Sequence, residues 1–533
     1  MSRLEIASPK RAKIVMEGLY KDLERRIESS PPGLCPVDMA RAFLELCHAQ
    51  TCGKCVPCRI GLGQLNNFIR EVLDGKATMK TLDIMEQTAL SIMESADCAI
   101  GYEAANMVYK GLIGYRDDYI EHIQNGRCTC TYNQPVPCVS LCPAHVDIPG
   151  YIALVGEGRY ADAIRLLRKD NPFPTTCGFI CEHPCEARCR RNMVDDSINI
   201  RGLKRVAADF AGEVDPPQCA PSTGKKIAIL GGGPGGLSAA YYLQLMGHQT
   251  TVYEMLPELG GMLRYGIPNY RLPKERLDDD IRAILKTGVQ VKNGLKIGQD
   301  ITIQELRQQY DVVLITIGAS TDKKLGLENE DADGIISAVQ FLRNVGKNQI
   351  IDLTGKEVVV IGGGNVSMDA VRTAKRLGAK KVSIVYRRRV ADMTALPGEI
   401  EGAVAEGIEL QTLKAPASID VDENHHVKGI YVTPQMVSSI RDGRASIKPT
   451  GEEDIYIPCD VLIVAIGQNI ETHHFEQAGI PVERGKIITK STGAFENLPG
   501  VFAGGDCASG PASVIKAIAA AKVVAANIDE YLG

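Results

Sequence analysis

The chain has 533 residues and a mass of 57.6 kDa, which allows three or four domains at roughly 150 residues each. Its 60 Lys and Arg against 65 Asp and Glu give a net charge of −5, so a nucleic acid is not expected as the main partner. With 44% hydrophobic and 23% charged residues, no apolar run of membrane-spanning length and no signal peptide, the sequence excludes disordered and fibrous classes and predicts a cytoplasmic protein without a membrane partner.

Cysteines are concentrated near the start of the chain. Thirteen of the 17 lie within the first 185 residues. Thiols of a cytoplasmic protein stay reduced, and clustered thiols there bind metal more often than they form disulfides. Apolar residues recur every three or four positions in segments 12–27, 39–47 and 81–93. This periodicity predicts a helical, cysteine-bearing domain over residues 1–125.

The first cysteine group is TCGKCVPCR at 51–59, followed later by Cys98. Two C-x-x-C steps place Cys52, Cys55 and Cys58 on one tight loop, and Cys98 supplies a fourth thiol. Four thiolates suit a [4Fe–4S] cluster, and zinc accepts the same ligands. The spacing alone leaves both metals open.

A second group holds eight cysteines, which could serve two four-iron clusters. They are Cys128, Cys130, Cys138, Cys142, Cys177, Cys181, Cys185 and Cys189. The even spacing of four from Cys177 to Cys189 predicts a helix with several thiols on one face. We therefore expect a helical two-cluster domain over 126–220, followed by a Pro-rich linker at 215–226.

An internal repeat follows the linker. Residues 225–254 and 356–387 each contain an apolar strand, a glycine turn, a helix and a second apolar strand with a polar end. Two such units predict two nucleotide-binding domains. The strands at 311–318 and 460–467 both end in Ile-Gly, and we interpret them as the crossings between the two domains.

The first glycine loop has the G-x-G-x-x-G pattern of a dinucleotide site. Gly231 permits a tight turn, Gly233 lets the backbone approach a pyrophosphate, and Gly236 lets the helix pack closely on the strand. Glu254 ends the second strand, where a carboxylate can accept hydrogen bonds from an adenosine ribose. The candidate loop residues are Gly231, Gly233, Pro234, Gly235 and Gly236.

The second loop differs in its third small position and in the end of its second strand. Tyr386 is followed by three arginines instead of an acid. Arg387 and Arg388 could bind a 2′-phosphate, which a carboxylate would repel, so this unit predicts an NADP(H) site. A solvated basic strand end is the alternative. The candidate loop residues are Gly362, Gly364, Asn365, Val366 and Ser367.

FAD in the first unit and NADP(H) in the second is the economical assignment. After a predicted strand, Gly505-Asp506 could bind the ribityl chain, and a small-residue helix that begins near Ser513 and includes Val514 could aim its N-terminus at the flavin. A disulfide reductase also has two such domains. It needs a redox cysteine pair near the flavin, whereas no cysteine lies between Cys219 and Cys459.

These motifs resemble two known families. Residues 128–533 are similar to the small subunit of glutamate synthase and to the FAD/NADPH portion of dihydropyrimidine dehydrogenase, through the cysteine runs, GGGPGGLSAA, LGGMLRYGIPNYRLP, GGGNVSMDA, YRR and GGDCASGP in that order. Residues 50–110 resemble the C-terminal cluster domain of the NADH-binding flavoprotein subunit of respiratory complex I, through TCGKCVPCR and CAIG. Both resemblances favour iron–sulfur over zinc.

The resemblance also implies individual ligands. Gly261 and Arg271 would contact FAD together with Asp506. One cluster would take Cys128 or Cys130, Cys138 and Cys189, and the other would begin with Cys142 and add Cys181 and Cys185. The chain departs from the family at Asn133, where a cysteine is usual, and at Lys204, where a Gln or Glu ligand is usual. Because an ammonium has no lone pair, Cys177 is the expected substitute.

The sequence thus predicts an α/β protein with two Rossmann-like domains, for FAD at 225–350 and 456–533 and for NADP(H) at 351–455, preceded by two helical iron–sulfur domains. We expect an oxidoreductase that moves hydride between NADP(H) and FAD and single electrons between FAD and three [4Fe–4S] clusters, without a catalytic acid or base.

The expected partners are other redox subunits, including an iron–sulfur/FMN NADH-dehydrogenase-like subunit, and ferredoxin at the level of the complex. An electron-bifurcating transhydrogenase would combine them. One alternative is a glutamate synthase small subunit, which is not expected to carry residues 1–125. The other is a zinc-stabilised scaffold with a vestigial nucleotide fold.

Overall fold

The structure is a computed structural model that describes Gly18 and residues 35–125, 136–349, 351–441 and 444–533. The chain divides into two compact units. The first takes Met1–Ile148 with His183–Ile200, and the second takes Pro149–Glu182 with Arg201–Gly533. The segment 126–220, expected as one domain, therefore contributes to both units. No helix in the described ranges is long and apolar enough to cross a bilayer.

The first unit is a helical bundle around one apolar core, to which Phe43, Leu65 and Met85 contribute fully buried side chains. The helices predicted at 39–47 and 81–93 are confirmed, whereas the segment 12–27 lies outside the described residues apart from Gly18. The elements are α2 (Pro36–Ala49), η1 (Pro57–Gly61), α3 (Leu62–Leu73), α4 (Met79–Ser95), α5 (Ala99–Gly114), α6 (Arg116–Asn125), α7 (Pro137–Leu141), α11 (Pro184–Ala187) and η2 (Arg190–Met193).

The single helix expected from Cys177 to Cys189 is wrong. α10 (Pro174–Ile180) ends before Cys181, and α11 begins at Pro184. Proline cannot continue a helix, and the residue before it is driven out of the helical region; His183 indeed has a φ of +43°. Cys177 and Cys181 therefore belong to the second unit, and Cys185 and Cys189 to the first. The neighbouring helices are α8 (Ile148–Gly156), α9 (Tyr160–Asp170) and α12 (Ile200–Phe210).

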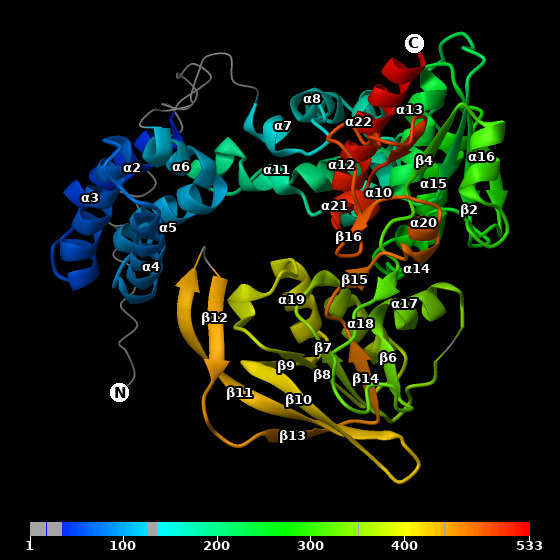
Figure 1. The fold of residues 1–533 in the computed structure, drawn as a ribbon. Helices are drawn as coiled ribbons and strands as arrows, with labels where there is room; N and C mark the ends of the chain where they lie inside the picture. The colour runs from blue at the N-terminus through cyan, green and yellow to red at the C-terminus, as the bar shows by residue number, and fades with distance from the viewer. Residues whose placement is uncertain (1–17, 19–34, 126–135, 350, 442–443) are drawn as a thin grey trace. The chain divides into compact units, whose positions relative to one another are not determined.

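The first parallel sheet of the second unit has the strand order β18-β4-β1-β2-β3. β1 and β4 are apolar on both faces because helices cover both sides of the sheet (Figure 1). The strands are β1 (Lys226–Leu230), β2 (Gln249–Glu254), β3 (Gln290–Asn293), β4 (Val312–Ile315) and β18 (Val501–Ala503). The helices are α13 (Pro234–Leu245), α14 (Met262–Tyr265), α15 (Lys274–Leu285), α16 (Ile303–Gln309), α21 (Asp506–Ser509) and α22 (Val514–Leu532).

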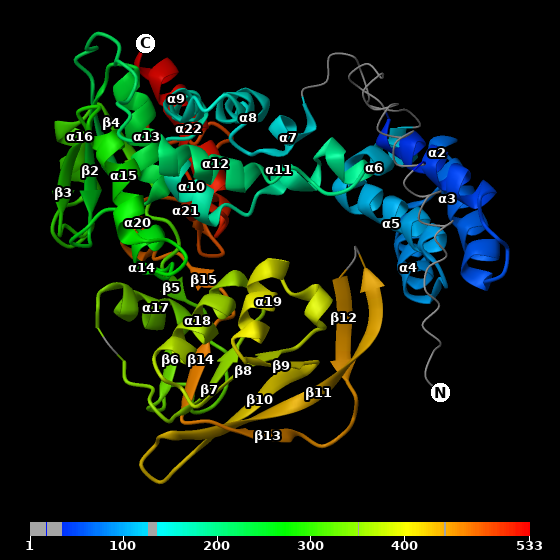
Figure 2. The same ribbon diagram turned by 180° about the vertical axis from the view of Figure 1, so that it is seen from behind.

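The second parallel sheet has the order β6-β14-β7-β8-β9, and an antiparallel sheet of β10 to β13 packs against its apolar face (Figure 2). The parallel strands are β6 (Ile335–Ser337), β7 (Glu357–Ile361), β8 (Lys381–Tyr386), β9 (Glu409–Thr412) and β14 (Val461–Val464). The antiparallel strands are β10 (Lys414–Val421), β11 (Val427–Arg441), β12 (Arg444–Pro449) and β13 (Ile455–Pro458). The helices are α17 (Ala338–Gly346), α18 (Asn365–Arg376), η3 (Val390–Asp392) and α19 (Pro397–Ala405).

The two sheets are joined where the sequence places the crossings. β4 and β14 occupy equivalent positions beside β1 and β7, and the segments that follow them pair as an antiparallel ribbon of β5 (Thr321–Asp322) and β15 (Gln468–Asn469). The ribbon places β6, α17 and β14 with the second sheet, so the two domains exchange near 321 and 468 instead of near 350 and 456. The remaining elements are α20 (His473–Gln477), β16 (Val482–Glu483) and β17 (Lys486–Ile487).

Candidate functional site

The first glycine loop joins β1 to α13 and leaves no room for a side chain at Gly231 or Gly236. Gly231 has a φ of +111°, and a Cβ there would lie 2.5 Å from the carbonyl oxygen of Thr316. A Cβ on Gly236 would lie 1.9 Å from the carbonyl oxygen of Gly231. Gly233 precedes α13 without a side-chain cap, and Pro234 needs no N–H in the first turn. The loop therefore presents backbone amides at a helix start, as a pyrophosphate site requires.

Glu254 ends β2 and folds back onto this loop. Its side chain is buried; one carboxylate oxygen accepts from the Gly232 amide at 2.7 Å and the other from the Leu256 amide at 2.8 Å. Burial raises the pKa of Glu254, and the backbone amides partly oppose this. Each carboxylate oxygen has a second lone pair, so Glu254 can hold the loop and still accept from a ribose hydroxyl.

The other candidate FAD residues lie at the same carboxyl edge of the sheet. A Cβ on Gly261, whose φ is +52°, would lie 2.8 Å from the Cα of Gly233, so this segment passes directly over the glycine loop. Gly505 and Asp506 follow β18, where burial raises the pKa of the half-buried Asp506. Val514 opens α22, whose first turn has no side-chain cap. The bare loop and these donors and acceptors fit an extended dinucleotide.

The second loop joins β7 to α18 with a similar geometry. Gly362 has a φ of +144°, and its Cβ would lie 2.3 Å from the carbonyl oxygen of Ala465. Ser367, at the third small position, is fully buried and its hydroxyl has no partner among the described residues. Gly364 precedes α18 without a side-chain cap, and Val366 lies in its first turn.

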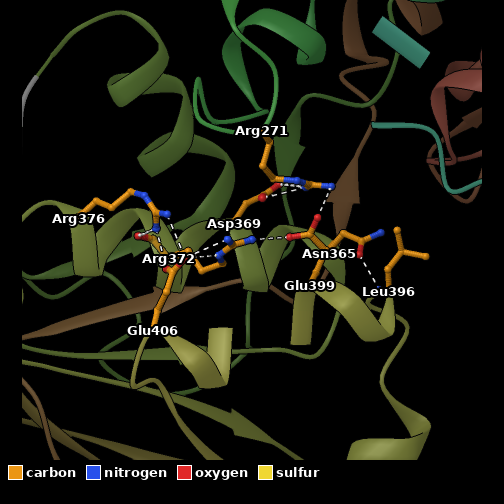
Figure 3. Close-up of polar contacts among 8 residues, drawn as sticks. All are labelled: Arg271, Asn365, Asp369, Arg372, Arg376, Leu396, Glu399 and Glu406. Atoms are coloured by element: carbon orange, nitrogen blue, oxygen red, sulfur yellow. Dashed lines mark hydrogen bonds and ion pairs between the residues drawn. The ribbon is translucent and has the colours of Figure 1, made fainter. Parts of the chain in front are cut away.

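Asn365, the first residue of α18, is held from both sides. Its side-chain oxygen accepts from the Leu396 amide at 2.9 Å, and its side-chain nitrogen donates to Glu182 at 3.2 Å (Figure 3 shows the Leu396 contact). Glu182 directly follows Cys181 in the chain. A loop of the predicted cluster region thus contacts the predicted NADP(H) loop within the second unit.

The three arginines after β8 have different surroundings. Arg387 is exposed, and the described residues give its side chain no hydrogen bond or ion pair. Arg388 is half-buried and donates through Nε to the Ala445 carbonyl at 3.0 Å. Arg389 pairs with Asp392 through Nε at 2.8 Å and Nη2 at 3.0 Å, and it lowers the pKa of that carboxyl to about 2. Arg387 is therefore the guanidinium best placed for a phosphate.

Arg271, expected at the FAD site, directs its guanidinium to the second unit of the repeat. Nη1 donates to both carboxylate oxygens of Asp369 at 2.8 Å, and Nη2 lies 3.1 Å from Glu399 (Figure 3). Asp369 is on α18 and Glu399 is on α19. The contact of Arg271 with FAD remains a prediction.

The four cysteines of the first group converge in the first unit. Burial raises the pKa of the Cys58 thiol to about 12, and the neighbouring Cys55, Cys98 and Cys52 thiols raise it further. A Cβ on Gly101 would lie 2.5 Å from the Cys58 sulfur, so this glycine makes room for the thiol. Four neighbouring thiols are the donor type that an iron–sulfur cluster takes, and the assignment of these four cysteines to one cluster stays a prediction.

The second cysteine group is described only in part, and it falls in both units. In the first unit the half-buried thiol of Cys138 has its pKa raised by burial and by nearby Cys189 and Cys142. Cys185 is buried on α11. In the second unit, Cys177 is raised in pKa by its contact with Cys181 and by burial, and Lys204 opposes the shift. Cys128 and Cys130 lie outside the described residues.

Among the described residues, no group of three or more Cys, His, Asp or Glu side chains is placed so that it could hold a metal ion. The partition of ligands among the clusters therefore stays a prediction, and so does the replacement of the usual Gln or Glu at Lys204 by Cys177. Lys204 itself is buried next to Cys177, where the resemblance places a ligand.

Sequence reasoning missed several acids that connect parts of the second unit. Asp280, fully buried on α15, accepts from the amides of Thr175 at 3.2 Å and Thr176 at 2.7 Å and so caps the helix that carries Cys177. Asp369 and Glu399 bind Arg271. The only signal in the sequence was an acidic residue on a helix face whose periodicity predicts burial, as at Asp369.

Three protein families match successive parts of the chain, and each agrees with the prediction made for that part. Residues 225–521 match the pyridine nucleotide-disulphide oxidoreductase family. Residues 38–122 match the iron–sulfur binding region of the NADH-ubiquinone oxidoreductase F subunit, and residues 114–215 match domain II of dihydropyrimidine dehydrogenase, a 4Fe-4S cluster domain. These matches confirm FAD, NADP(H) and iron–sulfur clusters as the cofactors, while the number of clusters stays a prediction.

Two relatives differ in how much of the chain they cover. The beta subunit of the NADP⁺-dependent formate dehydrogenase of Moorella thermoacetica is 32% identical over 92% of this chain and 79% of its own length. The small chain of the NADPH glutamate synthase of Escherichia coli is 34% identical over 74% of this chain and 88% of its own. The resemblance to glutamate synthase is thus confirmed, and it excludes about a quarter of the chain.

A solved structure supports the fold. FprA of Mycobacterium tuberculosis matches with a TM-score of 0.51 and 21% identity, over 58% of this chain and 85% of its own. At this identity the likeness concerns the fold alone, and it confirms the predicted pair of dinucleotide-binding domains.

Proposed function

Because the chain belongs to the pyridine nucleotide-disulphide oxidoreductase family, we propose that it is the NADP(H)-reactive subunit of a larger electron-transfer complex. FAD, when bound, exchanges a hydride with NADP(H) and single electrons with iron–sulfur clusters. The chain's own residues bind and orient these groups: Glu254 and the first glycine loop hold one adenosine, and Arg387 beside the second loop selects the other. The first cysteine group would be the exit to a partner subunit.

The observation that carries this proposal is that the second strand of each unit ends beside a side chain of opposite charge. One loop is closed by the buried carboxylate of Glu254, and the other is followed by the exposed guanidinium of Arg387, which has no ion pair with any described residue. A carboxylate suits a ribose diol, and a guanidinium suits a 2′-phosphate. The two loops lie in one compact unit with the FAD-type and NADP-type sheets joined by a short ribbon.

The proposal is tested by anaerobic titration of the purified full chain. NADPH should bleach the flavin absorbance and then the broad iron–sulfur absorbance, and NADH should do so at least tenfold more slowly. Three four-iron clusters predict about twelve iron atoms per chain. A colourless protein that contains zinc would refute the proposal, and equal rates with NADH would refute the role of NADP(H).

One feature favours partner subunits beyond those of glutamate synthase, and another favours a reducing compartment. The residues matched by the Moorella subunit include the first cysteine group, whereas about a quarter of the chain is outside the match with glutamate synthase. The described cysteines form no disulfide. We therefore infer other redox subunits as partners and a reducing compartment, the cytoplasm, as the location. Replacing Cys98 by Ser should spare flavin reduction by NADPH and stop transfer to the co-purified subunits.

An electron-bifurcating transhydrogenase is the second candidate. It is favoured by the match of residues 38–122 to a domain of an NADH-oxidising enzyme. In the natively purified complex, NADPH oxidation would then require NAD⁺ and oxidised ferredoxin together. Oxidation of NADPH with either acceptor alone would rule out bifurcation and leave the simpler electron-transfer role.

A further inference from the structure

A short loop of the FAD-type domain inserts into the surface of the NADP-type domain. Tyr270 and Arg271 lie between α14 and α15. The Tyr270 ring meets arginines of α18, and the Arg271 side chain meets α18 and α19 (Figure 3). Arg271 binds Asp369 through both carboxylate oxygens and also lies 3.1 Å from Glu399. One guanidinium therefore holds two helices of the other domain at once.

Burial makes this contact specific. The Arg271 side chain is 11% exposed and that of Asp369 is 6% exposed. The two terminal nitrogens of the planar guanidinium bind two different carboxylates, since Nη1 contacts both oxygens of Asp369 and Nη2 contacts Glu399. Removing Arg271 would leave the buried Asp369 carboxylate uncompensated. Arg271 is thus a connection with a defined orientation, unlike the exposed Arg282–Asp279 ion pair on α15.

A second layer of charges surrounds the first. Arg372 donates to Glu399 at 2.6 Å and to Glu406 at 2.9 Å, and Arg376 lies 3.9 Å from the centre of the Tyr270 ring. The two arginines and the ring place the loop on α18, and Glu399 shares its charge between Arg271 and Arg372. The network joins the two domains through side chains alone.

The connection reaches the nucleotide loop itself. Asp369 stands one helical turn after Asn365, the first residue of α18, and the Asn365 side chain binds the Leu396 amide at the start of α19. Because α18 begins directly after Gly364, a fixed Asp369 fixes the direction in which the loop and the helix N-terminus face. The orientation of a bound dinucleotide follows from that direction.

We propose that Arg271 is a positioning residue that orients the NADP(H)-binding domain against the FAD-binding domain. This inference rests on the proposed function, in which a hydride passes between NADP(H) and FAD. In that step a hydride leaves C4 of the nicotinamide and binds N5 of the flavin, so NADPH becomes NADP⁺ and the flavin gains two electrons. Arg271 takes part in no bond change; its role is to bring the two sites into reacting geometry, which is worth a large rate factor.

The test compares Arg271→Ala and Arg271→Lys with the matched control Arg282→Ala, which removes an exposed, singly paired arginine of α15. In anaerobic stopped-flow experiments at saturating NADPH, R271A should reduce the limiting rate of flavin reduction at least tenfold and change the NADPH Kd less than threefold. R271K, which keeps the charge without the fork, should fall between R271A and wild type. The long-wavelength charge-transfer absorbance of nicotinamide on flavin should weaken in the same order.

Two further measurements keep the proposal falsifiable. All three variants should retain one FAD per chain, and hydrogen exchange of α18 and α19 should rise in R271A but not in R282A. Loss of FAD from both R271A and R271K would identify Arg271 as a flavin ligand and overturn the proposal. An unchanged limiting rate with unchanged exchange would also overturn it. A wild type that NADPH does not reduce would refute the proposed function, while the exchange data would still decide whether Arg271 orients the domains.

Discussion

The two glycine-loop units share a backbone plan and differ where their second strand ends. The Gly231 amide donates to the Tyr253 carbonyl at 2.8 Å, and the Gly362 amide donates to the Val385 carbonyl at 3.0 Å. This register makes Glu254 and Tyr386 equivalent residues. The arginines that suggested NADP(H) therefore follow the position of the acid by one to three residues.

Both strand-end side chains cover the middle glycine of their loop. A Cβ on Gly232 would lie 3.0 Å from a carboxylate oxygen of Glu254, and a Cβ on Gly363 would lie 2.6 Å from the Tyr386 ring. The carboxylate accepts from the loop, whereas the Tyr386 hydroxyl donates away from it to the Asp392 carbonyl at 2.7 Å. The Tyr386 ring thus covers Gly363 as the Glu254 carboxylate covers Gly232. In the second unit, the residues after β8 are therefore the ones expected to recognise the charge of the ligand.

The largest expected effect breaks the first unit. In Gly236→Ala the new Cβ would overlap the Gly231 carbonyl oxygen, so the loop must open and the purified chain should lose more than nine-tenths of its FAD. Flavin released by denaturation, counted per chain, measures this. The matched control is Gly235→Ala, whose Cβ meets nothing within 4 Å, and it should keep its FAD. Full FAD content in G236A would show that close helix–strand packing is not needed in this unit.

The repeat, the crossings and the helical start of the chain could be predicted because their signals are local. Glycine spacing and apolar periodicity lie within about 30 residues of each unit. The Arg271–Asp369 pair was not predictable, since its partners are 98 residues apart and each has a plausible local role. Local pattern also misled at Cys177 to Cys189, where equal spacing predicted a helix that Pro184 interrupts.

The second-largest effect concerns the arginines after β8 and the affinity for NADPH compared with NADH. A charge-assisted contact of Arg387 with a 2′-phosphate is worth about 1.5–3 kcal/mol, or about ten- to a hundredfold in affinity. Arg387→Ala should weaken NADPH binding by that factor, leave NADH nearly unchanged and spare FAD. Arg388→Ala should have a smaller effect, because part of its guanidinium is already bound to Ala445.

The control for Arg387 is Lys380→Ala, which removes an exposed charge at the opposite end of β8. The dependence of the flavin-reduction rate on NADPH or NADH concentration, measured by anaerobic stopped-flow, provides the Kd values. Equal losses for NADPH and NADH in R387A would mean that the guanidinium binds the shared pyrophosphate, and the contrast between the two units would then not concern the 2′-phosphate.

The helices after the two loops also differ at one buried position, where α13 has Ser238 and α18 has Asp369. Burial raises the pKa of Asp369 to about 6, against the opposing effect of Arg271; Glu399, Arg372 and Tyr270 also face it. Above pH 6 the carboxylate is ionised and binds Arg271. Below pH 6 it is protonated, so the ionised fraction falls to about one-tenth at pH 5.

We therefore expect the limiting rate of flavin reduction to fall up to tenfold between pH 7 and pH 5. The sign for stability is opposite: because the folded-state pKa lies above the ordinary value, protonation of Asp369 favours the folded state, and its stabilising effect is lost as the pH rises through 6. As the pH falls from 7 to 5, the limiting rate should therefore fall while the effect of Asp369 on the melting temperature is to raise it. In Asp369→Asn the rate should be lower and independent of pH in this range; an unchanged pH profile in D369N would assign the titration to another group.

The smallest effect concerns the acid that each unit places near its loop. The first unit turns Glu254 inward onto a backbone amide, whereas the second has the exposed Glu182 on the side chain of Asn365, at the start of α18. An exposed charge contributes about 0.3–1 kcal/mol and is screened by salt. Removing the negative charge in Glu182→Gln should therefore tighten dinucleotide binding about two- to fivefold at low ionic strength and hardly at all in 0.5 M salt. Because the pyrophosphate is common to both dinucleotides, NADPH and NADH should gain equally, in contrast to R387A.

Glu423→Gln, at the exposed turn between β10 and β11, is the matched control. Weaker binding in E182Q would show instead that Glu182 acts by holding Asn365 in place, so that the hydrogen bond outweighs the repulsion between its charge and the phosphates.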